Sequence, residues 1–161
     1  MADTERTDRP PSDDAVAARL GLLAQAVTDE LGDVVAIERE SIPSASVEGT
    51  RLVPHREGAC YVYWAELDSS ELVLQVGDGG RWELNRDLKA VERIERIVQS
   101  VINGRVTEVF GPARSQVTVT LDDVTTEVST GYRGLLGAIP MPSWKDRGRV
   151  VAYDPYRSSP T

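Results

Sequence analysis

Residues 72–104 constrain the fold of this chain most, because they indicate a hairpin, a helix and a helix stop in direct succession. Apolar and less apolar residues alternate over 72–76, and Asp78-Gly79-Gly80 supplies a tight turn before the chain returns. An apolar stripe at helical spacing then runs over residues 88–102 and ends at Gly104. Folding accounts for the whole stretch, and none of its residues is placed for chemistry.

The residues before this unit predict one helix and two strands. Leucine and valine recur at helical spacing over about 13–31, which indicates an amphipathic N-terminal helix. Residues 34–37 are apolar and predict a short strand, whereas prolines and glycines over 41–58 predict a long irregular loop with room for one edge strand. Residues 59–67 form the strongest strand pattern, and their large side chains on both faces indicate a central strand.

The residues after the helix predict further strands. These are a strand over 105–110, a second hairpin over 117–130 with threonines on one face, and a short strand at 150–153. Residues 131–144 mix glycine, proline and apolar side chains. We therefore expect an α+β fold, in which an antiparallel sheet of about five to seven strands carries a central helix (about 88–103) on one face and the N-terminal helix beside it.

The length of 161 residues predicts one domain with a hydrophobic core of its own. We expect a disordered tail over residues 1–11, a single domain over 12–156 and a frayed end over 157–161. No apolar run approaches the roughly 20 residues of a membrane span, and the polar, acidic start does not resemble a secretory signal. The single cysteine fits a reducing compartment, so a cytoplasmic protein is expected.

The net charge of −8 is unevenly distributed. Residues 1–87 carry 18 acidic and 8 basic side chains, whereas residues 88–161 carry 8 acidic and 10 basic ones. An acidic protein repels phosphate backbones, so the charge disfavours nucleic-acid binding and favours a basic partner. The simpler alternative is that the acidic surface only keeps the protein soluble.

Candidate catalytic residues are scarce. Cys60 and His55 are the only thiol and the only imidazole, but a reactive cysteine needs an electropositive, accessible site, and Cys60 lies in an apolar strand. No cysteine or histidine pair has metal-ligand spacing, and Gly77–Gly80 precedes a strand instead of the helix of a phosphate-binding loop. We predict no catalytic residue, no metal and no cofactor, and the sequence leans against an enzyme.

Aromatic residues are the feature most open to a role in binding, because tyrosine and tryptophan are enriched at interface hot spots. We interpret Trp64 and Trp82 as core residues. The expected partner-binding surface combines the remaining aromatic residues with acidic side chains and with the apolar segment after residue 131. Its predicted residues are Tyr61, Tyr63, Glu66, Asp68, Glu71, Asp78, Leu135 and Trp144.

The leading hypothesis is a non-enzymatic, cytoplasmic protein-interaction domain that presents this acidic, aromatic surface to a basic protein partner. Its size and acidity are compatible with the small immunity proteins that neutralise bacterial toxins, a comparison of class that rests on no motif. The alternative is a small-ligand-binding domain, or an enzyme of unknown type, with a pocket between the sheet and residues 131–144. A third class is nucleic-acid binding by the basic C-terminal segment. The sequence indicates neither the partner's identity nor the oligomeric state.

Overall fold

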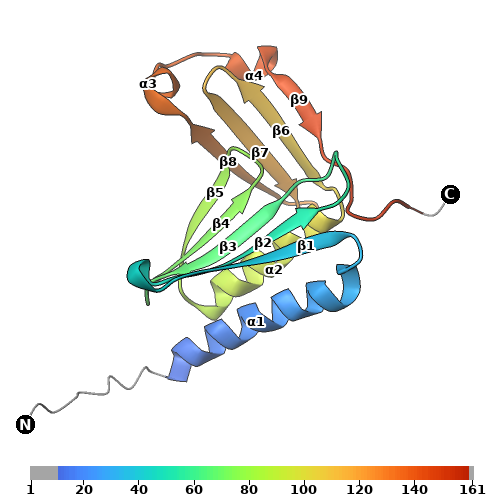
Figure 1. Cartoon of the computed structure of the whole chain (residues 1–161). Coiled ribbons are helices and arrows are strands. Elements are labelled where there is room, and N and C mark those ends of the chain that lie inside the picture. Colours follow the sequence, from blue (N-terminus) through green and yellow to red (C-terminus); the bar gives the residue numbers. More distant parts are fainter. Residues whose placement is uncertain (1–10, 160–161) are drawn as a thin grey trace, which may run out of the picture.

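The computed structural model describes residues 11–159 and shows two antiparallel sheets with two long helices (Figure 1). The long helices are α1 (Pro11–Leu31) and α2 (Leu88–Ile102). The strands before α2 are β1 (Val35–Ile42), β2 (Val47–Pro54), β3 (Val62–Leu67), β4 (Glu71–Val76) and β5 (Gly80–Asn85). The elements after α2 are β6 (Val106–Gly111), β7 (Arg114–Thr120), β8 (Thr126–Tyr132), α3 (Gly134–Gly137), α4 (Trp144–Arg147) and β9 (Arg149–Ala152).

The α+β class is confirmed, but the strands form two sheets where one sheet of five to seven strands was expected. The first sheet has the order β1-β2-β3-β4-β5, and the second has the order β8-β7-β6-β9. β5 and β8 lie next to each other without a shared backbone ladder. Instead, the Ser129 hydroxyl accepts from the Arg81 amide at 2.9 Å and donates to the Arg81 carbonyl at 2.8 Å. A side chain therefore joins the sheets at this point.

The two long helices lie on the same side of the first sheet and enclose the main core with it (Figure 1). α2 presents its apolar stripe to the sheet, with Val91, Ile94 and Ile97 fully buried. The Asp87 side chain caps this helix by accepting a hydrogen bond from the Ala90 amide at 2.7 Å. The central helix is thus confirmed, and the N-terminal helix is also present, although it begins at Pro11 instead of near residue 13.

The strand pattern around residue 62 is confirmed. β3 is the middle strand of the first sheet, with Val62 and Trp64 buried on the helix side. The hairpin of β4 and β5 pairs in the predicted place, and Trp82 lies opposite Leu74 in the core. The short strand expected at 150–153 is β9, which pairs with β6.

The prediction of a long irregular loop over 41–58 is wrong. The chain forms a regular hairpin of β1 and β2, joined by a 3-10 turn at Pro43–Ala45, and β1 is the edge strand. Thr50 and Leu52 are the buried residues that hold β2 on the core side. Two inward-facing residues among prolines, glycines and charged residues give too weak an alternation of apolar and polar positions to predict a strand. The strand forms because of its tertiary packing, which outweighs its low strand propensity.

Parts of the predicted termini lie outside the described residues. These are residues 1–10 of the expected disordered tail, and Pro160 and Thr161 of the expected frayed end. Arg157, also in that expected frayed end, donates to the Glu30 carbonyl and to the Asp33 carboxylate. Of the helices in residues 11–159, none is long and apolar enough to cross a membrane.

Candidate functional site

The second sheet leaves one face open to solvent. Its register alternates residues between a face toward the core, with Val106, Val117 and Val119 buried, and an outward face. The outward positions are Thr107, Val109, Gly111, Arg114, Gln116, Thr118, Thr120, Thr126, Val128, Thr130, Tyr132, Val150 and Ala152. We call these thirteen positions the outer face.

The outer face has an unusual composition. It contains no acidic residue and a single basic one, Arg114, although 27% of the chain is charged and about three or four charges would be expected at that frequency. No long helix within residues 11–159 covers it (Figure 1), and Val128 and Val150 expose 50% and 63% of their surface. An open sheet face with so few charged residues is a feature of interaction sites.

The segment from residue 133 to residue 148 packs over one end of this face. A Cβ atom on Gly111 would lie 2.5 Å from the Trp144 ring, and one on Gly137 would lie 2.9 Å from the Ala113 carbonyl oxygen. Both glycines are therefore required because ring and backbone approach so closely. This close packing gives Gly111 in β6 and Gly137 in α3 a structural role.

Arg114, on β7, holds the segment over residues 133–148 in place through hydrogen bonds to its backbone. Its Nε donates to the Pro112 carbonyl at 3.1 Å, and its Nη2 donates to the carbonyls of Leu136 and Ile139 at 3.2 and 2.6 Å. Its guanidinium also lies 5.6 Å from the centre of the Tyr132 ring. The residue is only 5% exposed. A buried cation thus organises the end of the outer face.

Two open pockets flank this segment. One has a volume of about 520 Å³ and is lined by Arg114, Tyr132, Gly134, Gly137, Ala138, Ile139 and Pro140. The other has a volume of about 590 Å³ and is mostly apolar, with Phe110, Met141 and Trp144 among its lining residues and Arg147 at its polar side. Pockets thus exist where the alternative hypothesis placed one, between the sheet and residues 131–144.

The two predicted tyrosines lie away from the outer face, on the side of the first sheet that faces away from the helices. The Tyr61 hydroxyl donates to the Gly77 carbonyl, and the Tyr63 hydroxyl donates to Glu40, both at 2.8 Å. Burial together with the Glu40 contact raises the pKa of Tyr63 to about 12. Burial, with a smaller contribution from Asp78, also raises the pKa of Tyr61. Both hydroxyls are therefore committed to contacts within the fold.

Three of the predicted acidic residues lie at the β3–β4 end of the first sheet. Glu66 pairs with Arg86 at 3.0 Å, and only 15% of its side chain is exposed. Asp68 accepts hydrogen bonds from the amide and the hydroxyl of Ser70, which lower the pKa of its carboxyl. Glu71, at the start of β4, is half-buried. Internal contacts thus already satisfy Glu66 and Asp68.

The remaining three predicted residues lie at or near the second sheet. Asp78, at the opposite end of β4 from Glu71, pairs with Arg133 at 2.8 Å. Leu135 is 92% exposed in α3, and Trp144 is half-buried against Gly111. The eight predicted residues are therefore spread over three places, and only Leu135 and Trp144 lie on the segment that borders the outer face.

Sequence reasoning missed a buried acid that joins the two sheets. The Glu108 side chain is fully buried and accepts hydrogen bonds from the Gly79 amide at 2.8 Å, the Asp78 amide at 3.3 Å and the Tyr153 hydroxyl at 2.6 Å. Burial, followed by the bond to Glu108, raises the pKa of Tyr153. A signal was present, because Glu108 shares a strand face with Val106 and Phe110, where a charge needs a partner.

Cys60 and His55 are the only thiol and the only imidazole of the chain, and the structure places them in different surroundings. Cys60 is buried, and desolvation raises the pKa of its thiol, so it is not a ready nucleophile. His55 is exposed in the loop after β2. Across the part of the chain that the structure describes, no group of three or more histidine, cysteine or acidic residues could hold a metal ion.

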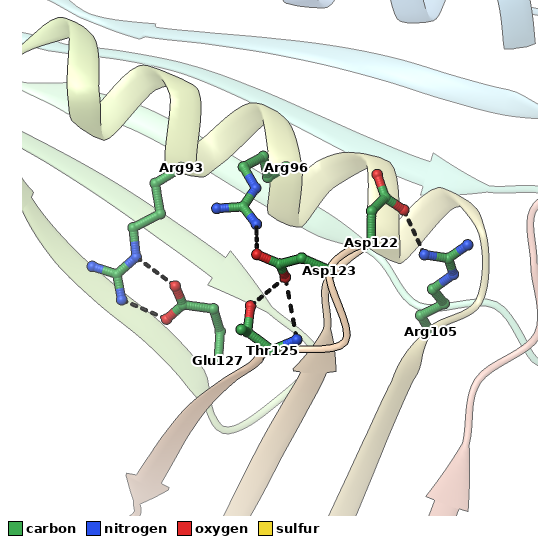
Figure 2. A network of polar contacts seen from close by, with 7 residues as sticks. All are labelled: Arg93, Arg96, Arg105, Asp122, Asp123, Thr125 and Glu127. Atoms are coloured by element: carbon green, nitrogen blue, oxygen red, sulfur yellow. Dashed lines mark hydrogen bonds and ion pairs between the residues drawn. The ribbon is translucent and has the colours of Figure 1, made fainter.

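Ion pairs fix the second sheet against α2. Figure 2 shows them as Arg93 with Glu127, Arg96 with Asp123, and Arg105 with Asp122. Asp123 also accepts from the amide and hydroxyl of Thr125, and these bonds lower the pKa of its carboxyl. Exposed pairs add little stability one by one. Arg93 and Arg96 tie β8 and the β7–β8 turn to α2, and Arg105, which directly precedes β6, ties the same turn to the start of that strand.

Comparison of the chain with known proteins gives no match: no family model matches the sequence, and no curated protein or solved structure matches it significantly. The outer face and its bordering pockets are therefore interpreted from their own geometry.

Proposed function

We propose that this chain is a protein-interaction domain and that its partner docks on the outer face of the second sheet. The observation that carries the proposal is the absence of acidic side chains from thirteen outward positions, with Arg114 the one basic residue among them. A solvent-facing sheet normally carries charges, which keep it soluble and prevent association. A sheet face that lacks them, in a chain so rich in charge elsewhere, favours contact with another surface.

The shape and chemistry of the face support a protein partner over other ligand classes. A flat sheet offers no enclosed volume for a small molecule, and stable association on it requires roughly 800 Å² from each partner. Nucleic acid would require several exposed cations along the face, and its one arginine is buried. A partner that presents apolar and uncharged polar side chains matches the alternating threonines and valines.

The acidic, aromatic surface expected from the sequence remains a second candidate. The specific observation in its favour is an open pocket of about 330 Å³ at the β3–β4 end, lined by Glu48, Glu66, Asp68 and two serines. A basic partner would be attracted to it. It is the weaker candidate, because Glu66 and Asp68 already have partners within the fold.

The test compares the two surfaces in the same experiment. The tagged chain is recovered from its native cells as wild type, as V128E/V150E and as V128Q/V150Q, and the proteins that copurify are quantified. The glutamine variant matches the glutamate variant in size and lacks its charge. Burying unpaired carboxylates in an interface costs several kcal/mol, so we expect the glutamate variant to lose its partner by at least about 100-fold.

The control variant D68K/E71K reverses charge at the acidic surface and should leave the same partner bound. Loss of the partner from D68K/E71K, with retention by V128E/V150E, would transfer the function to the acidic surface. Equal recovery from all variants, or no partner in any of them, would contradict the proposal. Circular dichroism of each purified variant establishes that the fold is retained.

A further inference from the structure

Arg114 is a buried cation that has no counter-ion among the described residues. Only 5% of it is exposed, and no carboxylate among the described residues lies within ion-pair distance of it. Its three hydrogen bonds go to backbone carbonyls, and the two nearby rings are neutral. Most of the other arginines on the structure's surface do pair with an acid, so the neutral surroundings of Arg114 stand out. Buried charges are normally paired.

One part of the Arg114 guanidinium is unused. Nε and Nη2 make the three hydrogen bonds to carbonyls, which leaves Nη1 with two N–H groups and no acceptor among the described residues. The residue lines the open pocket of about 520 Å³ that Tyr132, Ile139 and Pro140 also line. Ile139 is 51% exposed, so the pocket has an apolar rim that ligands can reach.

We propose that this pocket binds the carboxylate of a peptide, with the carboxylate on Arg114 and the neighbouring apolar side chain against Tyr132, Ile139 and Pro140. This proposal rests on the proposed function, since it assigns the carboxylate to a protein partner. Arg114 and Tyr132 belong both to the outer face, where that partner docks, and to the pocket lining. A hydrogen bond between a guanidinium and a carboxylate is stronger than one between neutral groups, and it would give the buried cation its missing counter-ion.

The pocket fits a carboxylate better than a phosphate. A phosphate group carries up to two negative charges and is usually held by several cations or backbone amides. Here one arginine supplies the charge, its free donors are the two on Nη1, and the rest of the lining is glycine, alanine, proline, isoleucine and tyrosine. A singly charged, flat anion attached to an apolar group matches that lining in both charge and polarity.

The test is a titration of the full chain with the peptide acetyl-Ala-Val-Leu-Ile carrying a free C-terminal carboxylate, followed by NMR shifts of backbone amides from 132 to 139. The same peptide with a C-terminal amide is the matched probe without the charge. We expect the acid to shift these amides and to bind at least about tenfold more tightly than the amide. Equal binding of both peptides, or no shift with either at millimolar concentration, would overturn the proposal.

Substitution at the pocket rim tests the role of Arg114 without removing it. Ile139→Asp places a carboxylate beside the guanidinium, where it competes with the ligand, and Ile139→Asn is the matched uncharged variant. Leu135→Asp adds the same charge to α3 at a position that is 92% exposed and does not line the pocket. We expect I139D to weaken binding by about tenfold or more, and I139N and L135D to change it by less than about threefold.

Equal loss in I139D and L135D would overturn the assignment to Arg114, because long-range repulsion would then explain it. Octanoate distinguishes the source of the carboxylate: binding of octanoate without binding of the peptide overturns the peptide assignment. The variants V128E/V150E leave the pocket lining unchanged, so the free peptide should still bind them. Failure of the peptide titration, with partner recovery still sensitive to V128E/V150E, would refute this inference and leave the proposed function standing.

Discussion

Replacing Glu108 by glutamine tests whether one buried carboxylate joins the two sheets. Its side chain is fully buried and accepts from two backbone amides and from the Tyr153 hydroxyl. Glutamine has nearly the same shape, but it keeps one acceptor oxygen and gains an NH2 group that points at hydrogen-bond donors. At least one backbone amide or the Tyr153 hydroxyl would then lose its acceptor.

The expected loss follows from these contacts. A buried donor left without an acceptor costs about 1–3 kcal/mol, and a hydrogen bond to a charged acceptor is worth about 1.5–3 kcal/mol. One lost acceptor and one weakened bond together predict that E108Q lowers the free energy of unfolding by about 2–4 kcal/mol. That is a large part of the 5–15 kcal/mol typical of a small domain.

Urea denaturation followed by tryptophan fluorescence measures the effect, because Trp82 is buried next to the joint between the sheets. Glu83→Gln is the matched control: it removes the same charge from a side chain that is 62% exposed, and we expect less than about 0.5 kcal/mol. Tyr153→Phe removes one of the three donors and should cost about 1–2 kcal/mol. An E108Q variant as stable as E83Q would refute the role of Glu108 in holding the sheets together.

Three further predictions concern the sheet joint, the tyrosines and the ion pairs. Gly79→Ala should lower the urea midpoint strongly, because the new Cβ would lie 2.3 Å from the Ser115 hydroxyl oxygen of β7. In the control Gly21→Ala in α1, the new Cβ meets nothing within 4 Å, and the substitution should stabilise the protein by up to about 1 kcal/mol. Because the folded-state pKa of Tyr63 is raised to about 12, its contribution to stability is present below pH 10 and is lost as the pH rises from about 10 to 12. Unfolding midpoints across that range should fall, and a flat profile would contradict the raised pKa of Tyr63. Glu127→Gln breaks the bond to Arg93 and should cost less than about 1 kcal/mol, with a smaller loss at high salt.

The sequence was sufficient for the elements whose signals are local. The stripe over 88–102 and the turn at 78–80 predicted α2 and the β4–β5 hairpin, because a helix period and a turn are properties of neighbouring residues. The burial of Trp64 and Trp82 and the central place of β3 were predicted for the same reason. The β1–β2 hairpin was missed, because contacts with distant elements outweigh its weak period.

The candidate site shows more clearly which features the sequence does not indicate. The sequence indicates the threonines of β7 as one face of a strand, and it predicts Leu135 and Trp144 as binding residues. The path of the chain over residues 11–159 leaves the outer face without a long helix on it (Figure 1), and this path is a property of the tertiary structure. The same is true of the burial of Arg114, which no neighbouring residue in the sequence indicates. For Glu108 the apolar strand face that it shares with Val106 and Phe110 indicates burial, but its partners come from distant parts of the chain.

The sequence by itself therefore determined the type and approximate place of α2, β3 and the β4–β5 hairpin, because residues within a few positions of each other decide the backbone's local choice. Tertiary structure alone decided that the strands divide into two sheets, that Glu108 joins them and that Arg114 meets only backbone carbonyls and neutral rings among the described residues. These properties depend on which side chains meet across 20 to 50 residues or more of chain. These distant contacts, and not the neighbours in sequence, set how deeply a charged side chain is buried and therefore how much its burial costs in free energy.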